Sequence, residues 1–210
     1  MRDVASSTVR RLSLYLQFLH ECEARGLATV SSGALAERGG ASPAQVRKDL
    51  SFVGSFGRRG VGYSVPLLAG RLREILGLVR RYRVILVGAG RVGAALAAYP
   101  GFRQRGFDVV AVYDADPARI GGAVDGLLVR SHERLEADLA AERADIAVIA
   151  TPAGAAQGVA DRLVKAGVRA LLNFAPVTLA VPPAVTVSDV NMALELEALS
   201  YALHRGPPQR

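Results

Sequence analysis

Apolar residues near the start of the chain recur three to four positions apart, which is the spacing of one face of an α-helix. The spacing predicts a first helix over about residues 8–25, ended near Gly26, and a second helix between paired serines and paired glycines in residues 31–40. The expected buried positions are Val9, Leu12, Leu16 and Leu19 in the first helix, and Leu35 and Ala36 in the second. Two short amphipathic helices are therefore expected at the start of the chain.

A third helix has a well-specified start. Ser42 suits the N-cap, Pro43 suits the first helical position, and Gln45 stands three residues after the cap, as in a capping box. The expected buried stripe is Val46, Leu50 and Val53, and the opposite face carries Ala44, Gln45, Arg47, Lys48 and Ser51. A helix, a short turn with glycine and a helix with a basic outer face are typical of a helix-turn-helix, whose second helix enters the DNA major groove.

Glycines interrupt the segment that follows the third helix. Over residues 54–63 they alternate with apolar and aromatic residues, which predicts a short two-stranded hairpin. Arg58 and Arg59 would lie at its tip, so the hairpin would serve as a wing beside the third helix. The alternative is an ordinary three-helix domain with a solvated basic face, because helix-turn-helix patterns are degenerate.

After an expected linker helix over residues 65–82, the pattern changes to that of a dinucleotide-binding unit. A buried strand at residues 84–87 is followed by a G-x-G-x-x-G loop and an alanine-rich helix to about Tyr99. The loop consists of Gly88, Ala89, Gly90, Arg91, Val92 and Gly93. In a Rossmann unit such glycines make the turn, admit the pyrophosphate and allow close packing of the helix.

A second strand over residues 108–113 ends in Asp114, which is 21 residues past Gly93. An acidic residue at this place binds the 2'-hydroxyl of the adenine ribose and would repel a 2'-phosphate, so NAD(H) is favoured over NADP(H). The alternative is that Asp114 caps the turn that leads to Pro117.

Helices and strands continue to alternate to residue 187, which predicts a doubly wound parallel sheet and an α/β protein. Helices are expected at residues 132–143 and 155–166, and strands at 145–150, 169–174 and 185–187. Ligands bind beyond the carboxyl ends of such strands, so the loops there are expected to hold the nicotinamide end. The residues concerned are Thr151, Pro152, Asn173, Ala175 and Pro176. Alternatively, the residues of either loop could serve only to form the turn between strand and helix.

A last amphipathic helix closes the chain. Its apolar stripe is Met192, Leu196, Leu199 and Leu203, with Asp189 near its N-cap. The stripe could pack on its own sheet or on a second subunit, with which a terminal helix is easily exchanged. The expected organisation is a DNA-binding unit at residues 1–80, a nucleotide-binding unit at 81–188 and a dimerisation helix at 189–210.

Charge separates the two halves of the chain, whose net charge is +7. Residues 1–80 hold 12 Lys and Arg against 6 Asp and Glu, whereas residues 81–210 hold 14 against 13. A polyanionic partner, either nucleic acid or a membrane surface, is therefore expected for the N-terminal part alone. Prolines interrupt the long uncharged stretch at residues 170–188, so no membrane span is expected.

The single cysteine, Cys22, excludes an intramolecular disulfide and a cysteine-based metal cage, is expected in the core, and fits a reducing cytoplasm. A dehydrogenase would need a proton-handling group and a substrate domain. His20, His132 and His204 lie on expected helices as surface or capping residues, and only about 20 residues follow the sheet. No catalytic residue and no metal site is therefore expected.

Several segments together resemble the Rex family of bacterial redox-sensing repressors. They are SPAQVRKDLSFVGSFGRRGVGY, GAGRVG, NFAP and the closing VSDVNMALELEALSYAL. The resemblance implies a cytoplasmic homodimer with winged-helix and Rossmann domains that reads the NADH/NAD+ ratio. NADH would release it from palindromic operators of respiratory and fermentative genes. An NAD-dependent oxidoreductase and a CoA-binding or structural Rossmann module stay open as alternatives.

The resemblance also implies roles for particular residues. Gln45, Arg47 and Lys48 would face the major groove, and the two arginines of the wing would face phosphates or the minor groove. The closing helix would be swapped between subunits. Tyr99 and Asp189 would lie near the switch, with Asp189 facing a basic residue of the first helix, either Arg10 or Arg11. Family members often have Asn-Leu within the glycine loop, where this chain has Arg91-Val92.

Overall fold

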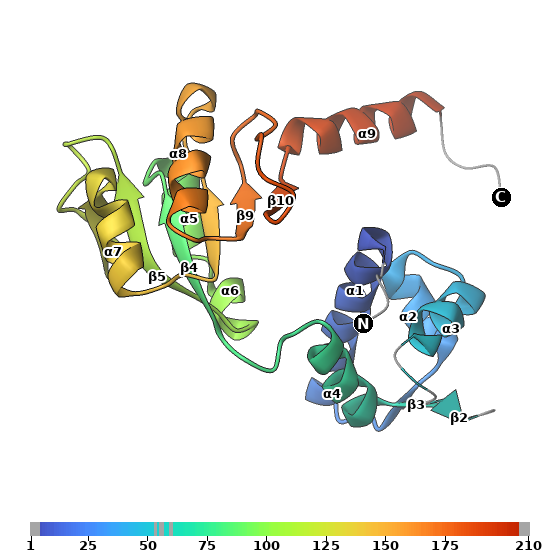
Figure 1. Ribbon diagram of the computed structural model, residues 1–210. Helices are drawn as coiled ribbons and strands as arrows, with labels where there is room; N and C mark the ends of the chain where they lie inside the picture. Colours follow the sequence, from blue (N-terminus) through green and yellow to red (C-terminus); the bar gives the residue numbers. More distant parts are fainter. Residues whose placement is uncertain (1–4, 53, 55–56, 59–60, 206–210) are drawn as a thin grey trace. The chain divides into compact units, whose positions relative to one another are not determined.

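The computed structural model describes residues 5–52, 54, 57–58 and 61–205 (Figure 1). Contacts between residues divide the chain into two compact units, Met1–Arg80 and Arg81–Arg210. Each unit has its own hydrophobic core.

The first unit is a small helical domain with a three-stranded sheet. Its elements are α1 (Ser6–Ala24), β1 (Thr29–Val30), α2 (Ser32–Gly39), α3 (Pro43–Ser51), β2 (Gly57–Arg58), β3 (Gly62–Ser64) and α4 (Val65–Ile75). The sheet has the order β1-β3-β2, with antiparallel neighbours. The three helices followed by a hairpin were expected, whereas β1, the third strand of this sheet, was not.

The core of this unit confirms most of the first helical stripe. Leu12, Leu16 and Leu19 are buried, as is Cys22. Val9 is 40% exposed, so its place in the buried stripe was predicted wrongly. Thr8 is the buried side chain at that level of the helix, so the apolar part of the stripe begins at Leu12.

The starts of α2 and α3 are capped as expected. The hydroxyl of Ser31 accepts a hydrogen bond from the amide of Ala34, and that of Ser42 accepts one from the amide of Gln45, both at 3.1 Å. The reciprocal half of the capping box is missing, because the Gln45 side chain turns to Asp49 instead. Val46 and Leu50 are buried, and Val53 lies outside the described residues.

The second unit is built on a seven-stranded sheet with the order β10-β9-β8-β4-β5-β7-β6. All neighbouring strands are parallel except β6 and β7. Its strands are β4 (Tyr82–Val87), β5 (Phe107–Asp114), β6 (Ala123–Val124), β7 (Leu127–Ser131), β8 (Ile146–Ile149), β9 (Ala170–Asn173) and β10 (Thr186–Asp189). Its helices are α5 (Arg91–Ala97), α6 (Pro100–Gln104), a 3₁₀ turn at His132–Arg134, α7 (Leu135–Ala141), α8 (Ala153–Lys165) and α9 (Met192–Arg205). The expected doubly wound sheet is confirmed.

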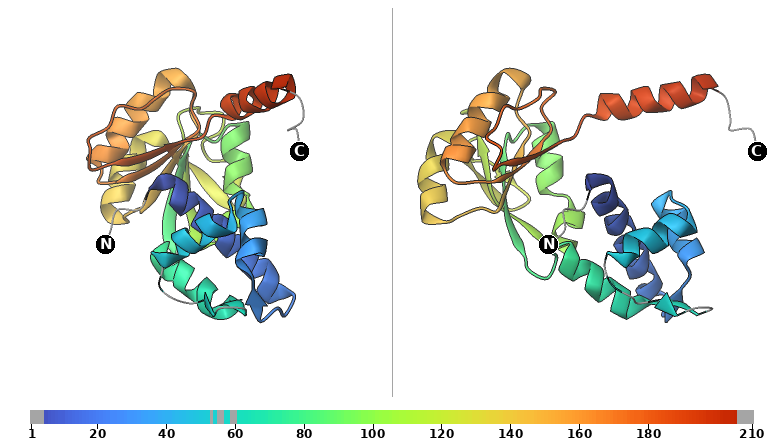
Figure 2. Two further views of the ribbon diagram at one scale, coloured as in Figure 1. Left: turned by 90° about the vertical axis from the view of Figure 1, so that its right-hand side faces the viewer. Right: turned by 45° about the vertical axis from the view of Figure 1, so that its right-hand side comes forward.

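Helices cover both faces of this sheet, and alternate residues of β4 show why. Ile85 and Val87 pack in the core beneath α7 and α8, whereas Val84 and Leu86 pack in the core beneath α5. Figure 2 shows α7 and α8, in yellow and orange, on one side of the strands and α5, in green, on the other. Every central strand is therefore buried on both faces, which agrees with its continuous apolar run.

Two helix ends and one hairpin differ from the expectation. The helix expected over residues 65–82 ends at Ile75, because Gly77 takes a positive φ of 73° and the chain then enters β4. The alanine-rich helix ends at Ala97, since the residue before Pro100 disfavours helical geometry. The β6–β7 hairpin was not expected.

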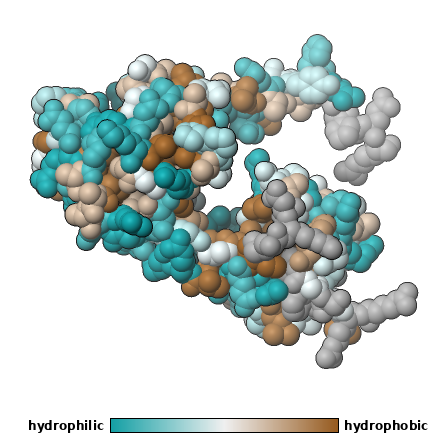
Figure 3. All heavy atoms as spheres, viewed as in Figure 1, coloured by the Kyte–Doolittle hydropathy of each residue, from teal (hydrophilic) through white to brown (hydrophobic). Residues whose placement is uncertain are grey.

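No residue of α9 is buried within its own chain. The four residues of its apolar stripe are exposed by 60% to 84%, and Figure 3 shows apolar atoms at the surface of this helix. The alternative prediction, that the stripe packs on the sheet of its own chain, is therefore wrong. The capping residue is Asn191, whose side-chain oxygen accepts from the amide of Ala193 at 3.0 Å, whereas Asp189 belongs to β10. Among the described residues no helix is long and apolar enough to cross a bilayer.

Candidate DNA-binding surface and nucleotide pocket

A buried carboxylate joins α1 to α3 in the first unit. The Asp49 side chain is 1% exposed and accepts two hydrogen bonds from Arg11, both at 2.7 Å, and one each from Tyr15 at 3.1 Å and Gln45 at 2.8 Å. Burial alone would raise the pKa of Asp49, but these donors outweigh it and lower the pKa below its ordinary value. The ionised network fixes how α3 sits on α1.

This network also holds Gln45. Its amide is half-buried and bound to Asp49, so its side chain helps to support α3, and its contact with DNA stays a prediction. Arg11 is also held by Asp49, which leaves Arg10 as the exposed one of the two candidate partners for Asp189. The burial of Asp49 could not be predicted from the sequence, because an aspartate within a helix usually faces solvent.

The outer face of α3 presents the basic side chains that were expected there. Arg47 and Lys48 are exposed, and the Arg47 guanidinium donates to the hydroxyl of Ser32 on α2 at 3.3 Å. Ser51 is exposed too, but its hydroxyl donates to the carbonyl of Lys48 within the same helix at 2.7 Å. The two cations are therefore the clearest candidates for contacts with DNA.

The expected hairpin after α3 is present. Gly57 pairs with Tyr63 and Arg58 with Gly62, and Gly62 has a φ of 94° that favours glycine. The backbone of Arg58 lies in β2, and Arg59 lies outside the described residues. Their contacts with DNA stay predictions.

In the second unit, the three glycines of the loop after β4 have different physical roles. Gly88 has a φ of 105°, and a Cβ there would lie 2.5 Å from the carbonyl oxygen of Ala150. A Cβ on Gly93 would overlap the carbonyl oxygen of Gly88. A Cβ on Gly90 would meet no atom within 4 Å, so the fold itself does not require glycine at this position. Gly90 is the glycine that leaves room for a ligand.

Asp114 ends β5 beside this loop and is 7% exposed. One carboxylate oxygen accepts from the amide of Ala89 at 2.7 Å, and the other accepts from the amide of Asp116 at 2.8 Å. Burial would raise the pKa of Asp114, but these amides and Arg119, at 3.2 Å, lower it. Asp114 thus caps the turn toward Pro117 and also holds the glycine loop. Its role toward a ribose stays a prediction.

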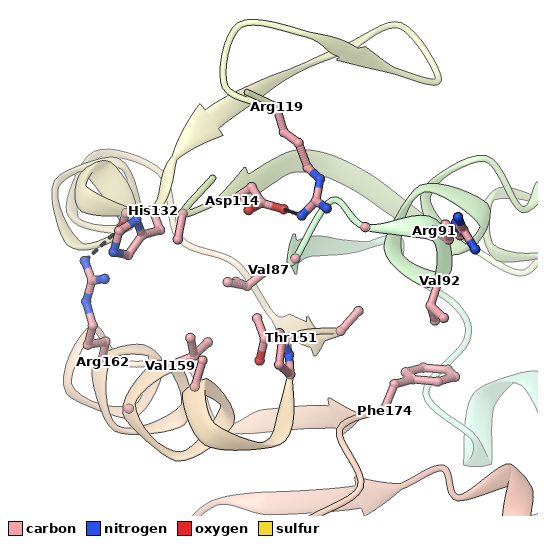
Figure 4. Close-up of a pocket in the computed structure, with 17 residues that line it drawn as sticks. Val87, Arg91, Val92, Asp114, Arg119, His132, Thr151, Val159, Arg162 and Phe174 are labelled. Carbon is pink, nitrogen blue, oxygen red and sulfur yellow. Dashed lines mark hydrogen bonds and ion pairs between the residues drawn. The ribbon is translucent and has the colours of Figure 1, made fainter. Parts of the chain in front are cut away.

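A pocket of about 710 Å³ lies over the carboxyl ends of β4, β5 and β8 (Figure 4). His132, Val159 and Arg162 stand at one end, Asp114, Arg119 and Thr151 in the middle, and Arg91, Val92 and Phe174 at the other end. Gly88, Gly90 and Pro152 also line it. The pocket therefore unites most of the residues expected to bind a nucleotide.

Asn173 and Ala175 were predicted to contact the ligand, but both are buried and neither lines this pocket, nor does Pro176. The Asn173 amide nitrogen donates to the carbonyl of Val177 and to the Asp189 carboxylate, both at 2.8 Å, and its oxygen accepts from the amide of Ala175 at 2.9 Å. These bonds fix the loop that places Phe174 at the pocket. Asn173 is therefore a support.

Tyr99 does not line the pocket either. It is 54% exposed, packs edge to face on Phe102 at 5.3 Å between ring centres, and borders a second cavity of about 360 Å³. Its role near the switch stays a prediction.

The residues at the His132 end of the pocket could not be predicted from sequence motifs. His132 was expected on a helix as a surface or capping residue; it stands at the start of the 3₁₀ turn and also lines the pocket, which was not expected. Two buried side-chain atoms of the described chain lack a hydrogen-bond partner, His132 Nδ1 and Thr151 Oγ1, and both residues line this pocket. Buried polar atoms are normally paired, which fits a polar ligand here.

Comparisons with known proteins agree with this division of the chain. Residues 3–51 match a family model described as a putative DNA-binding protein N-terminus, and residues 79–177 match one described as a CoA-binding domain. The chain is 46% identical over 198 residues to a redox-sensing transcriptional repressor Rex of Desulfitobacterium hafniense, which covers 94% of each protein. It is 48% identical to the Rex of Streptomyces coelicolor, over 95% of this chain and 78% of that protein.

Solved structures resemble the whole chain as well. A crystal structure of RSP in complex with β-NAD+ and operator DNA is 36% identical and has a TM-score of 0.91, and the match covers 98% of this chain and 94% of that one. A complex of RSP with β-NADH is 34% identical, with a TM-score of 0.88 and coverage of 98% and 96%.

Proposed function

Because the chain belongs to the Rex family of redox-sensing transcriptional repressors, we propose that it represses transcription according to the NADH/NAD+ ratio. NADH binding releases it from palindromic operators of respiratory and fermentative genes. The observation that carries this function is the presence, in one chain, of a helix with an exposed Arg-Lys face and of a pocket built on a dinucleotide loop.

We propose that each part of the dinucleotide lies at a different place in the pocket. Its pyrophosphate lies at Gly90, against the N-terminus of α5, and its adenosine ribose lies at Asp114 and Arg119. The nicotinamide lies against the apolar side chains of Val92 and Phe174, at the end of the pocket that Arg91 also lines. Transfer of a cation into an apolar site is costly, so this end favours the neutral reduced ring over the oxidised one. Only such a difference in affinity can shift a conformational equilibrium.

Operator binding falls to α3 and the hairpin. Arg47 and Lys48 enter or border the major groove, and the hairpin arginines contact the backbone. A palindromic operator requires two copies of α3 with a fixed spacing, which a homodimer joined through α9 provides. Asp189 and Tyr99 act near the switch, and Arg10 is the partner that we propose for Asp189. The site of action is the cytoplasm.

The relatives are regulators, and we propose that this chain responds to NADH without turning it over. A second candidate ligand is CoA, because the family model over residues 79–177 is a CoA-binding one. CoA and NADH share an adenosine diphosphate group, so the pocket alone does not separate them.

A gel shift on a palindromic operator, with calorimetry for each ligand, tests the function. NADH is expected to release the DNA and to bind far more tightly than NAD+, whereas NAD+ leaves the complex intact. CoA should compete weakly or not at all. If NAD+ released the DNA and NADH did not, the direction of the switch would be wrong; tight CoA binding would favour the second candidate.

Arg47→Ala and Lys48→Ala are each expected to weaken operator binding about tenfold without a change in NADH affinity. A residue that contacts phosphate should also reduce the slope of log affinity against log salt by about one, whereas a residue that reads a base should relax sequence preference. Fluorescence anisotropy over a salt series measures both. Arg71→Ala, on α4, removes the same charge elsewhere in the unit and should change little. A loss of NADH affinity in either α3 variant would contradict the separation of functions.

A further inference from the structure

The end of the pocket farthest from Phe174 has a wall formed by the 3₁₀ turn after β7 and by α8. His132 stands on the turn, and Gly158, Val159 and Arg162 stand on α8 (Figure 4). This end lies beyond Asp114, on the side away from the proposed nicotinamide place. If the ribose lies at Asp114, the adenine ring is the part of the ligand that reaches this wall.

His132 presents a polar atom whose partner is missing. Its Nδ1 is buried and has no hydrogen-bond partner in the described part of the chain. A buried nitrogen that makes no hydrogen bond is unfavourable. Because protein atoms cover Nδ1 in this orientation of the ring, the imidazole must turn about its Cβ–Cγ bond before a ligand can supply the missing partner.

The position of His132 is fixed by the helix opposite. The Arg162 guanidinium donates to the carbonyl oxygen of His132 at 2.8 Å and also forms an ion pair with the Glu136 carboxylate on α7. The backbone that carries the imidazole is thus held from α8, and the ring does not depend on a loose loop. Such support is what a residue that reads a ligand group requires.

Gly158 lies in the middle of α8, where glycine is less favourable for the helix than any other residue except proline. It lines the pocket, and a Cβ built on it would meet no atom within 4 Å. The protein therefore keeps a helix-weakening residue although its own packing leaves room for a side chain. The open space lies on the pocket side, where a flat ring needs it.

We propose that His132 and Gly158 make this end of the pocket specific for adenine. The adenine ring lies flat on α8 at Gly158 and Val159. The imidazole of His132 turns toward the base, and its Nδ1 accepts a hydrogen bond from the exocyclic amino group. The inference rests on the proposed function, because it takes an adenine dinucleotide as the ligand. It adds two specificity-determining residues to that site.

Reduced nicotinamide hypoxanthine dinucleotide tests the role of His132, because it differs from NADH by an oxygen in place of the amino group. Calorimetry on the full-length protein should show NADH binding about 5–10-fold more tightly than this analogue. In His132→Leu, NADH should bind about 5–10-fold more weakly and the preference should vanish. His132→Gln, which keeps an acceptor, should retain part of it. An unchanged preference in both variants would overturn the role of His132.

Gly158→Ala tests the flat wall, with Gly154→Ala as its matched control. Both glycines lie on α8 with no atom within 4 Å of a built Cβ, but only Gly158 lines the pocket. Both variants should melt at a higher temperature than the parent. Only Gly158→Ala should weaken the binding of NADH and of its hypoxanthine analogue, by the same factor of about tenfold. Equal NADH affinity in the two variants would place the base elsewhere.

The parent protein separates failure of this inference from failure of the proposed function. If NADH neither binds the parent nor releases operator DNA, the proposed function is wrong. If NADH binds and releases DNA but the variants keep the parental preference and affinity, the function stands and the adenine site is wrong. Glu133→Gln, an exposed neighbour outside the pocket, should behave as the parent and controls for changes to the turn.

Discussion

Gly90→Ala is expected to lower NADH affinity about 100-fold and to leave a repressor that stays on its operator at high NADH. The added methyl group would stand where the pyrophosphate approaches the backbone, and overpacking of this kind costs roughly 1–3 kcal/mol or more. Because a Cβ on Gly90 meets no protein atom within 4 Å, the fold and the DNA affinity should not change. Calorimetry with NADH and a gel shift with and without NADH measure the two effects.

Gly93→Ala provides the contrast. Its Cβ would overlap the carbonyl oxygen of Gly88, so this variant should lose both NADH binding and thermal stability of the second unit. A Gly90→Ala protein that melts at the parental temperature but binds NADH normally would show that the pyrophosphate does not lie on this loop.

Leu196→Asp combined with Leu199→Asp is expected to convert the protein to monomers and to weaken operator binding about 100-fold or more. Both leucines belong to the apolar stripe of α9, where they are 67% and 60% exposed within one chain. Two charges there would have to be buried unpaired in a subunit interface. Loss of the second recognition helix removes the gain from linked binding, which is commonly 10²-fold or more. Sedimentation and anisotropy measure the two changes.

His204→Asp adds a negative charge to the same helix outside the stripe and should leave a dimer with parental operator affinity. A double leucine variant that stays dimeric would show that α9 is not the interface. A monomer with full operator affinity would show instead that dimerisation is not needed for DNA binding.

The repeating patterns of the sequence predicted the fold because each depends on local chemistry. Ser42 and Pro43 define a helix start wherever they stand, and a strand followed by Gly88 and Gly93 closes only as a βα turn. The β6–β7 hairpin was open to prediction too: its turn is Asp125-Gly126, both with positive φ, which is a strong signal between apolar residues. The hairpin was missed because the strands on either side of the turn are too short to give a clear alternating pattern.

The support of the site could not be predicted in the same way, because it depends on contacts between residues far apart in the chain. Asn173 has the right chemistry and lies at a strand end, yet its amide is used to bind Asp189 and the next loop. The hydrogen bond from Gln45 to the buried Asp49 could not be predicted either, because the helical pattern places Gln45 on the outer face. His132 carries no motif, and only the packing of α8 brings it into the pocket.

The connection between β10 and α9 sets a limit on how the dimer can rearrange. Only Val190 and Asn191 separate the last residue of β10 from the first of α9, and two residues span at most about 7 Å. The linker therefore restricts the movement of α9, and a displacement of that helix beyond this length must also move the edge strand β10. That strand ends at Asp189, one hydrogen bond from the loop that carries Phe174. A longer linker would therefore weaken the coupling between movement of α9 and the pocket of the same chain. Insertion of two or three glycines after Asp189 would lengthen it.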